Sequence, residues 1–130
     1  MPRSAVDRPE PREDALKRLY EADQRHSEPF SGDLGRRAAE LVDGVWDERE
    51  ALDEAIGDAS RHWRVERMPP VDRNVLRIAL WELWHHTRTP VPVVISEAVR
   101  LAKVYSTERS GRFVNGVLAK LASAEVPVTE

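Results

Sequence analysis

Four side chains near the end of the chain are of the types that bind single-stranded nucleic acid. Arg109 and Arg112 can neutralise phosphates, and Phe113 offers an aromatic face for a base. Asn115 carries an amide that can read the edge of a base. All four lie within two helical turns, so one helix would present them together. The alternative is an ordinary amphipathic core helix whose basic face is merely solvated, with Asn115 satisfying a neighbouring helix terminus.

The helix that would carry them is predicted over residues 106–122, STERSGRFVNGVLAKLA. Its apolar residues recur at helical spacing on one continuous arc, and Phe113 lies at the edge of that arc. Thr107 can cap the helix by accepting a hydrogen bond from a backbone N–H. Burial would contribute roughly 1.5–3 kcal/mol for each aliphatic side chain of the arc, namely Val114, Val117, Leu118 and Leu121. This helix should therefore dock on a core through one side and expose the other.

The sequence lacks the residue patterns of catalysis and of metal binding. The adjacent His85 and His86 would point about 100° apart on a helix, so they cannot share one metal ion. His26 and His62 lack partners at ligand spacing, and neither a glycine-rich phosphate loop nor a GxSxG turn occurs. The acidic residues between positions 43 and 58 are expected on solvated helix faces. We expect no catalytic residue, no metal and no cofactor.

Length and composition fit one helical domain. A chain of 130 residues can bury roughly two thirds of its unfolded surface. The absence of cysteine excludes a disulfide framework and a thiolate metal site. No apolar run approaches the ~20 residues that cross a bilayer, and residues 1–14 lack the apolar core of a signal peptide. We therefore expect a cytoplasmic protein without a membrane partner.

Charge is distributed unevenly along the chain. The formal net charge of −3 taken alone argues against a general nucleic-acid binder. Residues 31–60, however, carry three Lys or Arg and nine Asp or Glu, whereas residues 61–121 carry eleven and five. One face of the protein can therefore be basic although the whole chain has a negative net charge. The alternative is that the uneven charge only reflects which helix faces are solvated.

Periodic apolar residues predict six helices, over about residues 11–26, 33–46, 48–63, 70–83, 92–105 and 106–122. Asp33 is expected in the first turn of the second helix, where a carboxylate suits the helix dipole. Trp63 is expected on the apolar face at the end of the third. The wide apolar arc of the fourth indicates a central helix with neighbours on two sides.

The predicted fold class is all-α, a compact bundle of about six main helices with no sheet. The proline-rich start indicates a disordered tail over residues 1–11. A single helical domain is expected over residues 12–122, followed by a C-terminal tail over 123–130.

Three segments, in this order and spacing, resemble the NusB family of transcription antitermination factors: VDRNVLRIA (71–79), ISEAVRLAK (95–103) and GRFVNGVL (111–118). The close match covers residues 69–121, and residues 12–25 match more loosely. The resemblance implies an all-helical protein that binds boxA-like single-stranded RNA of ribosomal leader transcripts. It also implies pairing with the small-subunit ribosomal protein NusE and a place in the transcription elongation complex.

By this resemblance, the first helix and the start of the last helix form the RNA surface, which implies RNA-binding roles for Arg8, Arg12, Arg109, Arg112, Phe113 and Asn115. The chain departs from the family at its first helix, where prolines and acidic residues interrupt the usual arginine-rich run. Residues 1–30 hold six basic and seven acidic side chains, which weakens the expected phosphate binding. Arg109 stands where many relatives have an acidic residue, and this change should partly compensate.

The resemblance also places the protein-partner surface around the start of the fourth helix. Asp72, Arg73 and Arg77 are the residues there that could present charge to NusE, with Asp72 the foremost candidate. The alternative for Asp72 is that it only complements the helix dipole.

Two other functions remain open. One is a NusB-like protein-interaction or self-associating module, including a homodimer, with weak or no autonomous RNA binding. The interrupted arginine run favours that alternative. The other is an enzyme fragment, because a similar helical domain precedes some RNA cytosine methyltransferases. The end of the chain at Glu130 argues against the fragment, since no methyl-donor domain follows.

Overall fold

The computed structural model describes residues 10–61, 63–85 and 88–123. Within these ranges the helices are α1 (Pro11–Arg25), α2 (Arg36–Asp47), α3 (Arg49–Ala59), the short 3-10 helix η2 (Val65–Arg67), α4 (Pro70–Trp84), α5 (Val91–Tyr105) and α6 (Glu108–Ser123). The described ranges contain no strand. The predicted all-α fold with six main helices is confirmed. Residues 1–9 and 124–130, which make up most of the two expected tails, lie outside the described part of the chain.

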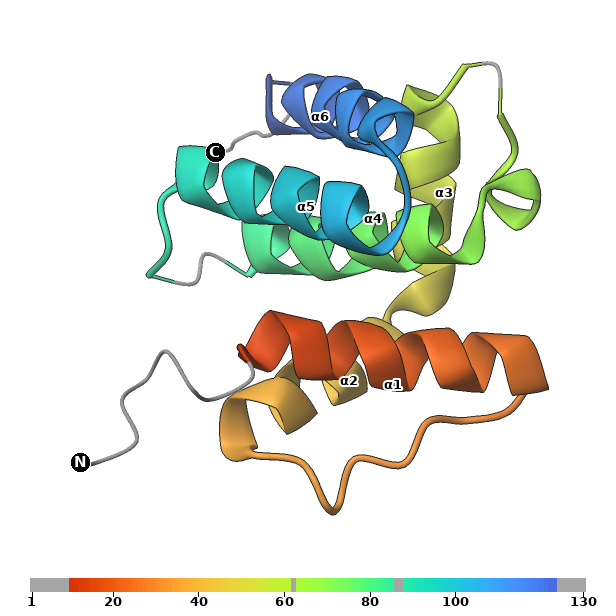
Figure 1. Cartoon of the computed structure of the whole chain (residues 1–130), viewed down its shortest axis with the longest axis vertical. Helices are drawn as coiled ribbons and strands as arrows, with labels where there is room; N and C mark the ends of the chain where they lie inside the picture. Colours follow the sequence, from red (N-terminus) through yellow and green to blue (C-terminus); the bar gives the residue numbers. More distant parts are fainter. Residues whose placement is uncertain (1–9, 62, 86–87, 124–130) are drawn as a thin grey trace.

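The helices form two groups that meet at α4 (Figure 1). In the figure, α1 and α2 lie side by side in the lower half of the molecule. Helices α4, α5 and α6 pack together in the upper half. Helix α3 runs between the two groups and contacts α2, α4 and α6. Because α4 contacts all five other α-helices, it is the central helix that its wide apolar arc predicts.

The core consists of aliphatic side chains contributed by every α-helix. Fully buried members are Leu16, Leu41, Leu52, Ile56, Leu76, Leu80, Leu101 and Leu118. Their helical spacing within each segment is the pattern that predicts the helices from the sequence. Among the described helices, none is at once long enough and apolar enough to cross a bilayer.

Local sequence features set the start of two helices. Helix α4 begins at Pro70, whose missing N–H costs nothing in the first turn. At the start of α6 the backbone N–H of Ser110 donates to Oγ1 of Thr107 at 3.0 Å. This bond is the cap that the sequence predicts.

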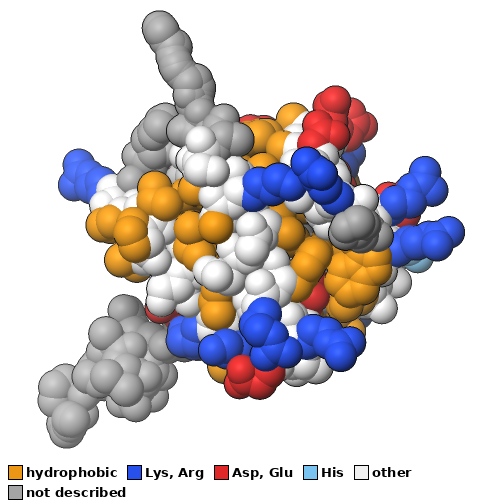
Figure 2. Space-filling model, turned by 90° about the horizontal axis from the view of Figure 1, so that it is seen from above, with side chains coloured by type: hydrophobic (Ala, Val, Ile, Leu, Met, Phe, Trp, Pro, Cys, Tyr) orange, Lys and Arg blue, Asp and Glu red, His pale blue; other side chains and the backbone are white. Residues whose placement is uncertain are grey.

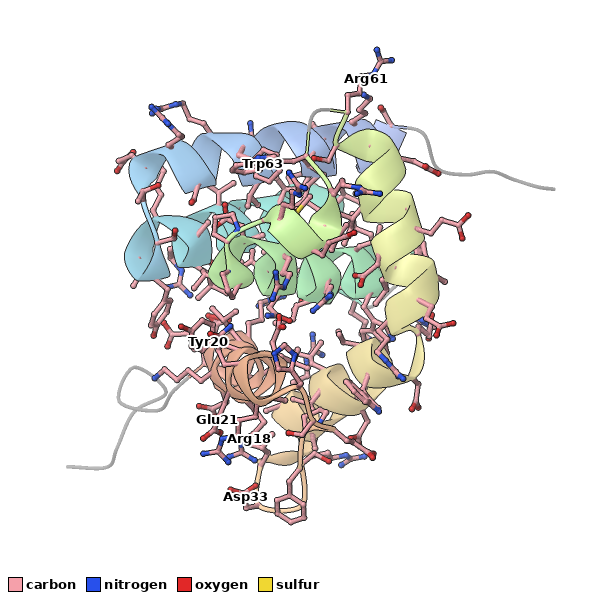
Figure 3. The ribbon with its side chains drawn as sticks, turned by 90° about the vertical axis from the view of Figure 1, so that its right-hand side faces the viewer. Arg18, Tyr20, Glu21, Asp33, Arg61 and Trp63 are labelled. Atoms are coloured by element: carbon pink, nitrogen blue, oxygen red, sulfur yellow. The ribbon has the colours of Figure 1, made fainter. Side chains whose placement is uncertain are left out.

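Two expected boundaries are wrong. Asp33 does not lie in the first turn of the second helix, which begins only at Arg36; its carboxylate accepts two hydrogen bonds from Arg18, at 2.6 and 3.0 Å (Figure 3). The third helix ends at Ala59 and does not reach Trp63, because Ser60 leaves helical geometry with φ −105° and ψ 78°. Trp63 therefore lies in the loop between α3 and η2.

Candidate nucleic-acid interface

One stripe of α6 faces solvent and carries most of its positive charge. Arg109, Arg112, Phe113, Gly116 and Lys120 follow one another at helical spacing, so they share one face. The three cations are exposed, and Phe113 is half-buried at the edge of the core. The opposite side of the helix is buried, as the apolar arc predicts. The helix thus brings together the arginines and the aromatic ring that the sequence singles out, and Asn115 is exposed beside them.

This stripe forms one wall of a groove of about 510 Å³, called the Trp63 groove below. Its lining consists of Ala59, Ser60, Arg61, Trp63, Arg112, Phe113, Gly116, Val117 and Lys120. The lining contains three cations and no carboxylate. Figure 2 views the molecule from the side on which α6 lies, and it shows lysine and arginine side chains around apolar surface. The groove therefore combines a positive potential with an apolar floor.

An aromatic pair joins the two walls of the Trp63 groove. The rings of Trp63 and Phe113 meet edge to face, with centroids 5.0 Å apart and planes at 78°. Trp63 is still 41% exposed. Nζ of Lys120 donates to the carbonyl of Ala59 at 3.4 Å, which also joins α6 to the end of α3. Figure 3 shows Trp63 lying beside α6 and Arg61 extending away from the body.

Sequence reasoning misses this second wall, because the apolar period assigns Trp63 to the buried face of a helix. The signal that could have found it is the flanking charge. Arg61 and Arg64 stand on either side of Trp63, and both are exposed. Cations interleaved with an aromatic residue are typical of surfaces that bind single strands.

The structure places Arg12 in an internal ion pair and not on the α6 surface. Its Nε and Nη2 each lie 2.8 Å from a carboxylate oxygen of Glu82, whose side chain is 0% exposed. Burial alone would lower the pKa of Arg12, but its bonds to Glu82 and to Glu10 raise the pKa above its ordinary value. The guanidinium stays charged and neutralises a buried carboxylate. The structure therefore gives the Arg12 guanidinium a carboxylate partner within the chain, and its expected role in phosphate binding stays a prediction. Arg8 lies outside the described residues.

Arg73 and Arg77, expected at the partner surface, are also engaged internally. Arg73 binds both carboxylate oxygens of Asp23 at 2.7 Å, and Arg77 binds those of Asp53 at 2.7 and 2.8 Å. Burial alone would raise the pKa of Asp23, but hydrogen bonds from Arg73 and Asn74 hold it below its ordinary value. These pairs tie α4 to α1 and α3, so the two guanidinium groups have partners within the chain, and their expected role at the partner surface stays a prediction.

Asp72, expected to face a protein partner, is buried. It is only 1% exposed, and its Oδ1 has no hydrogen-bond partner among the described residues. Burial raises the pKa of the Asp72 carboxyl, and the hydroxyls of Ser110 and Ser106 only partly oppose this. Sequence reasoning places it at the surface because the pattern reveals the helix start but not the packing of α6 over that turn. Asp72 therefore presents no charge to a partner in this structure.

This burial gives Asp72 a predictable effect on stability. The substitution Asp72→Asn is expected to stabilise the fold relative to the parent chain increasingly as pH rises. A carboxyl with a raised pKa favours the folded state when protonated, so its contribution is present below its ordinary pKa of 3.8 and is lost as pH rises through the raised value. Urea unfolding of both proteins over a pH series measures the difference. A difference that stays constant from acid to neutral pH would contradict the prediction.

Similarity to known proteins extends over nearly the whole described region. The sequence profile of the NusB family matches residues 5–123. The chain belongs to the NusB family. Members of the NusB family are transcription antitermination factors and not enzymes.

Individual NusB relatives support the same assignment. The transcription antitermination protein NusB of Anaeromyxobacter dehalogenans strain 2CP-1 is 49% identical over 115 residues, covering 88% of this chain and 78% of its own. The NusB protein of Sorangium cellulosum is 54% identical over 85 residues, covering 65% of this chain and 61% of its own.

Solved structures of NusB proteins share the fold. T. maritima NusB superposes with a TM-score of 0.80 at 32% identity, covering 90% of this chain and 91% of its own. A complex of antitermination factors NusB and NusE with dsRNA contains a chain that matches with a TM-score of 0.75 at 29% identity, covering 88% of this chain and 95% of that one.

Proposed function

We propose that this chain is an antitermination adaptor that binds boxA-like single-stranded leader RNA together with the ribosomal protein NusE, in the cytoplasm, within the transcription elongation complex. The observation that carries the proposal is the exposed stripe of Arg109, Arg112 and Lys120 beside a groove lined without any carboxylate. The solved complex of a NusB relative with NusE and dsRNA supports RNA and NusE as the classes of partner.

The α6 stripe can act by neutralising phosphates along the strand. Each cation that contacts a phosphate releases a bound counterion, so affinity should fall as salt rises. Phe113 then offers its ring to one base, whereas Asn115, about 200° away around the helix, can read only the edge of a different base. Because Arg12 is engaged with Glu82, binding depends on α6 and its neighbours more than on the described part of α1.

The test of this role is Arg112→Ala. The variant should bind single-stranded boxA RNA more weakly. The slope of log affinity against log salt should become shallower by about 0.7, the contribution of one phosphate contact in a single strand. Fluorescence anisotropy across a salt series measures both. Arg36→Ala is the matched control, because Arg36 is an exposed cation on α2 outside the Trp63 groove. An Arg112→Ala slope equal to that of the control would contradict the role.

The second candidate is a protein-interaction or self-associating module without autonomous RNA binding. The observation that favours it is the internal pairing of Arg12 with Glu82, which engages one of the cations expected to bind RNA phosphate. Anisotropy with labelled boxA RNA, measured with and without NusE and against a duplex of the same sequence, separates the candidates. Tight single-strand binding without NusE would remove the second one. Sedimentation across protein concentrations tests for a homodimer.

A further inference from the structure

We propose that the Trp63 groove holds one unpaired nucleobase of the bound strand, with Trp63 and Phe113 as its aromatic wall and with Arg61 and Lys120 beside the flanking phosphates. The inference rests on the proposed function. It places the base in the Trp63 groove, apart from the cations that bind the phosphates. It also gives roles to the residues after α3, to which neither the sequence nor the comparisons assign one.

The shape of the Trp63 groove fits a nucleobase. Its volume of about 510 Å³ can take a flat base and part of its sugar. The floor is apolar, with Val117 and Ala59 lining it together with the two aromatic rings. Gly116 keeps the groove open: a Cβ added there would meet no atom within 4 Å, so that space is empty. Because Gly116 lines the groove and is exposed, a larger side chain there is expected to occupy groove volume.

The lining of the groove combines aromatic rings with cations. Trp63 is held by its edge-to-face contact with Phe113 yet remains 41% exposed, so ring surface is available for stacking. Arg61, Arg112 and Lys120 surround this apolar floor. An apolar segment of a protein would bring no anion to these three cations. A nucleobase would pack on the apolar floor, and the phosphates on either side of it would pair with the surrounding cations.

The groove also discriminates between paired and unpaired strands. A base in a duplex can enter the groove only if its pairing and stacking are first broken, which costs free energy. An unpaired base enters without that cost. The groove should therefore favour single strands over duplexes, whereas phosphate contacts on α6 alone would bind either form.

The main experiment fills the groove with Gly116→Leu. Leucine forms helix more readily than glycine, and a Cβ at position 116 meets no atom within 4 Å, so the variant should fold at least as stably as the parent chain. Single-stranded boxA RNA, labelled with fluorescein, is titrated intact and with an abasic site at each position in turn. In the parent chain one abasic position should weaken binding about 5- to 160-fold, the range of one base–aromatic stack. In Gly116→Leu an abasic site at that position should cause no further loss of affinity. The salt dependence of RNA binding by this variant should equal that of the parent chain.

Ala51→Leu is the matched control, because it puts the same side chain on the exposed face of α3 outside the groove. It should bind as the parent chain does. Parent-like affinity of Gly116→Leu, or an abasic cost that persists in it, would overturn the base site while leaving the proposed function intact. Failure of the parent chain to bind the RNA, even with NusE, would overturn both. Equal affinity for a duplex that also depends on Gly116 would overturn the requirement for an unpaired base.

Tryptophan fluorescence gives an independent reading. Stacking of a base on Trp63 should quench part of the intrinsic emission when RNA is added. The quenching should be lost in Trp63→Phe and kept in Trp84→Phe, since Trp84 is also partly exposed but lies outside the groove. Quenching that survives Trp63→Phe would overturn the assignment of Trp63.

Discussion

Replacing Arg12 by methionine is expected to lower the free energy of unfolding by about 3–5 kcal/mol, because it leaves a buried carboxylate without its main partner. Glu82 has no exposed side-chain surface, and both of its oxygens accept hydrogen bonds from Arg12. Its other cation, Arg37, stands 3.7 Å away and is partly exposed, so it compensates little. Urea unfolding followed by circular dichroism measures the loss.

Arg100→Met is the control for this substitution. Arg100 also pairs with carboxylates, Glu10 and Glu97, but its side chain is 42% exposed, and such pairs contribute only about 0–1 kcal/mol. A loss from Arg12→Met no larger than that from Arg100→Met would refute the prediction. Adding Glu82→Leu to Arg12→Met should restore most of the stability, because the unpaired charge is then gone. The same pair of variants tells whether any loss of RNA binding by Arg12→Met follows from unfolding.

Gly44→Ala is expected to lower the free energy of unfolding by about 1–3 kcal/mol through overpacking. A Cβ at this position of α2 would overlap the indole ring of Trp81 on α4. The ring is not free to move aside, because Nε1 of Trp81 donates to Glu48 at 3.3 Å and its face packs on His85 with ring centroids 4.5 Å apart. Alanine gains only about 0.5–1 kcal/mol in helix propensity, so the clash should dominate.

A double-mutant cycle tests that cause. Trp81→Phe removes part of the ring that the new methyl group meets. In the Trp81→Phe background, Gly44→Ala should therefore cost less than about 0.5 kcal/mol. If the free-energy costs of the two substitutions are additive, the prediction is wrong, because Gly44→Ala would then destabilise the fold without a clash with Trp81.

The helices could be predicted from the sequence because their apolar residues repeat with the helical period, which is a local property. The end of α3 could not, since Trp63 continues that period although Ser60 has already left helical geometry. Its true neighbour, Phe113, is fifty residues further along the chain. The α6 stripe was accessible to sequence reasoning for the same local reason as the helices.

The role of each charge was the least predictable part. Arg12, Arg73 and Arg77 look like surface cations in the sequence, but their carboxylate partners lie on other helices. Asp72 follows a proline at a helix start, which is an exposed place in most helices, yet α6 packs over it. Only the packing of helices distant in sequence separates a cation that binds a ligand from one that neutralises a buried acid.

The two walls of the Trp63 groove come from segments on either side of α4 and α5, and the lining residues of the α6 wall end at Lys120. A ribosome that has released the chain only through α5 has therefore made half of the groove. Stacking between Trp63 and Phe113 must wait until translation has passed α6 and the helix has left the exit tunnel. The groove is therefore complete only in chains that include α6. A nascent chain that still lacks this helix cannot compete for the ligand of the groove.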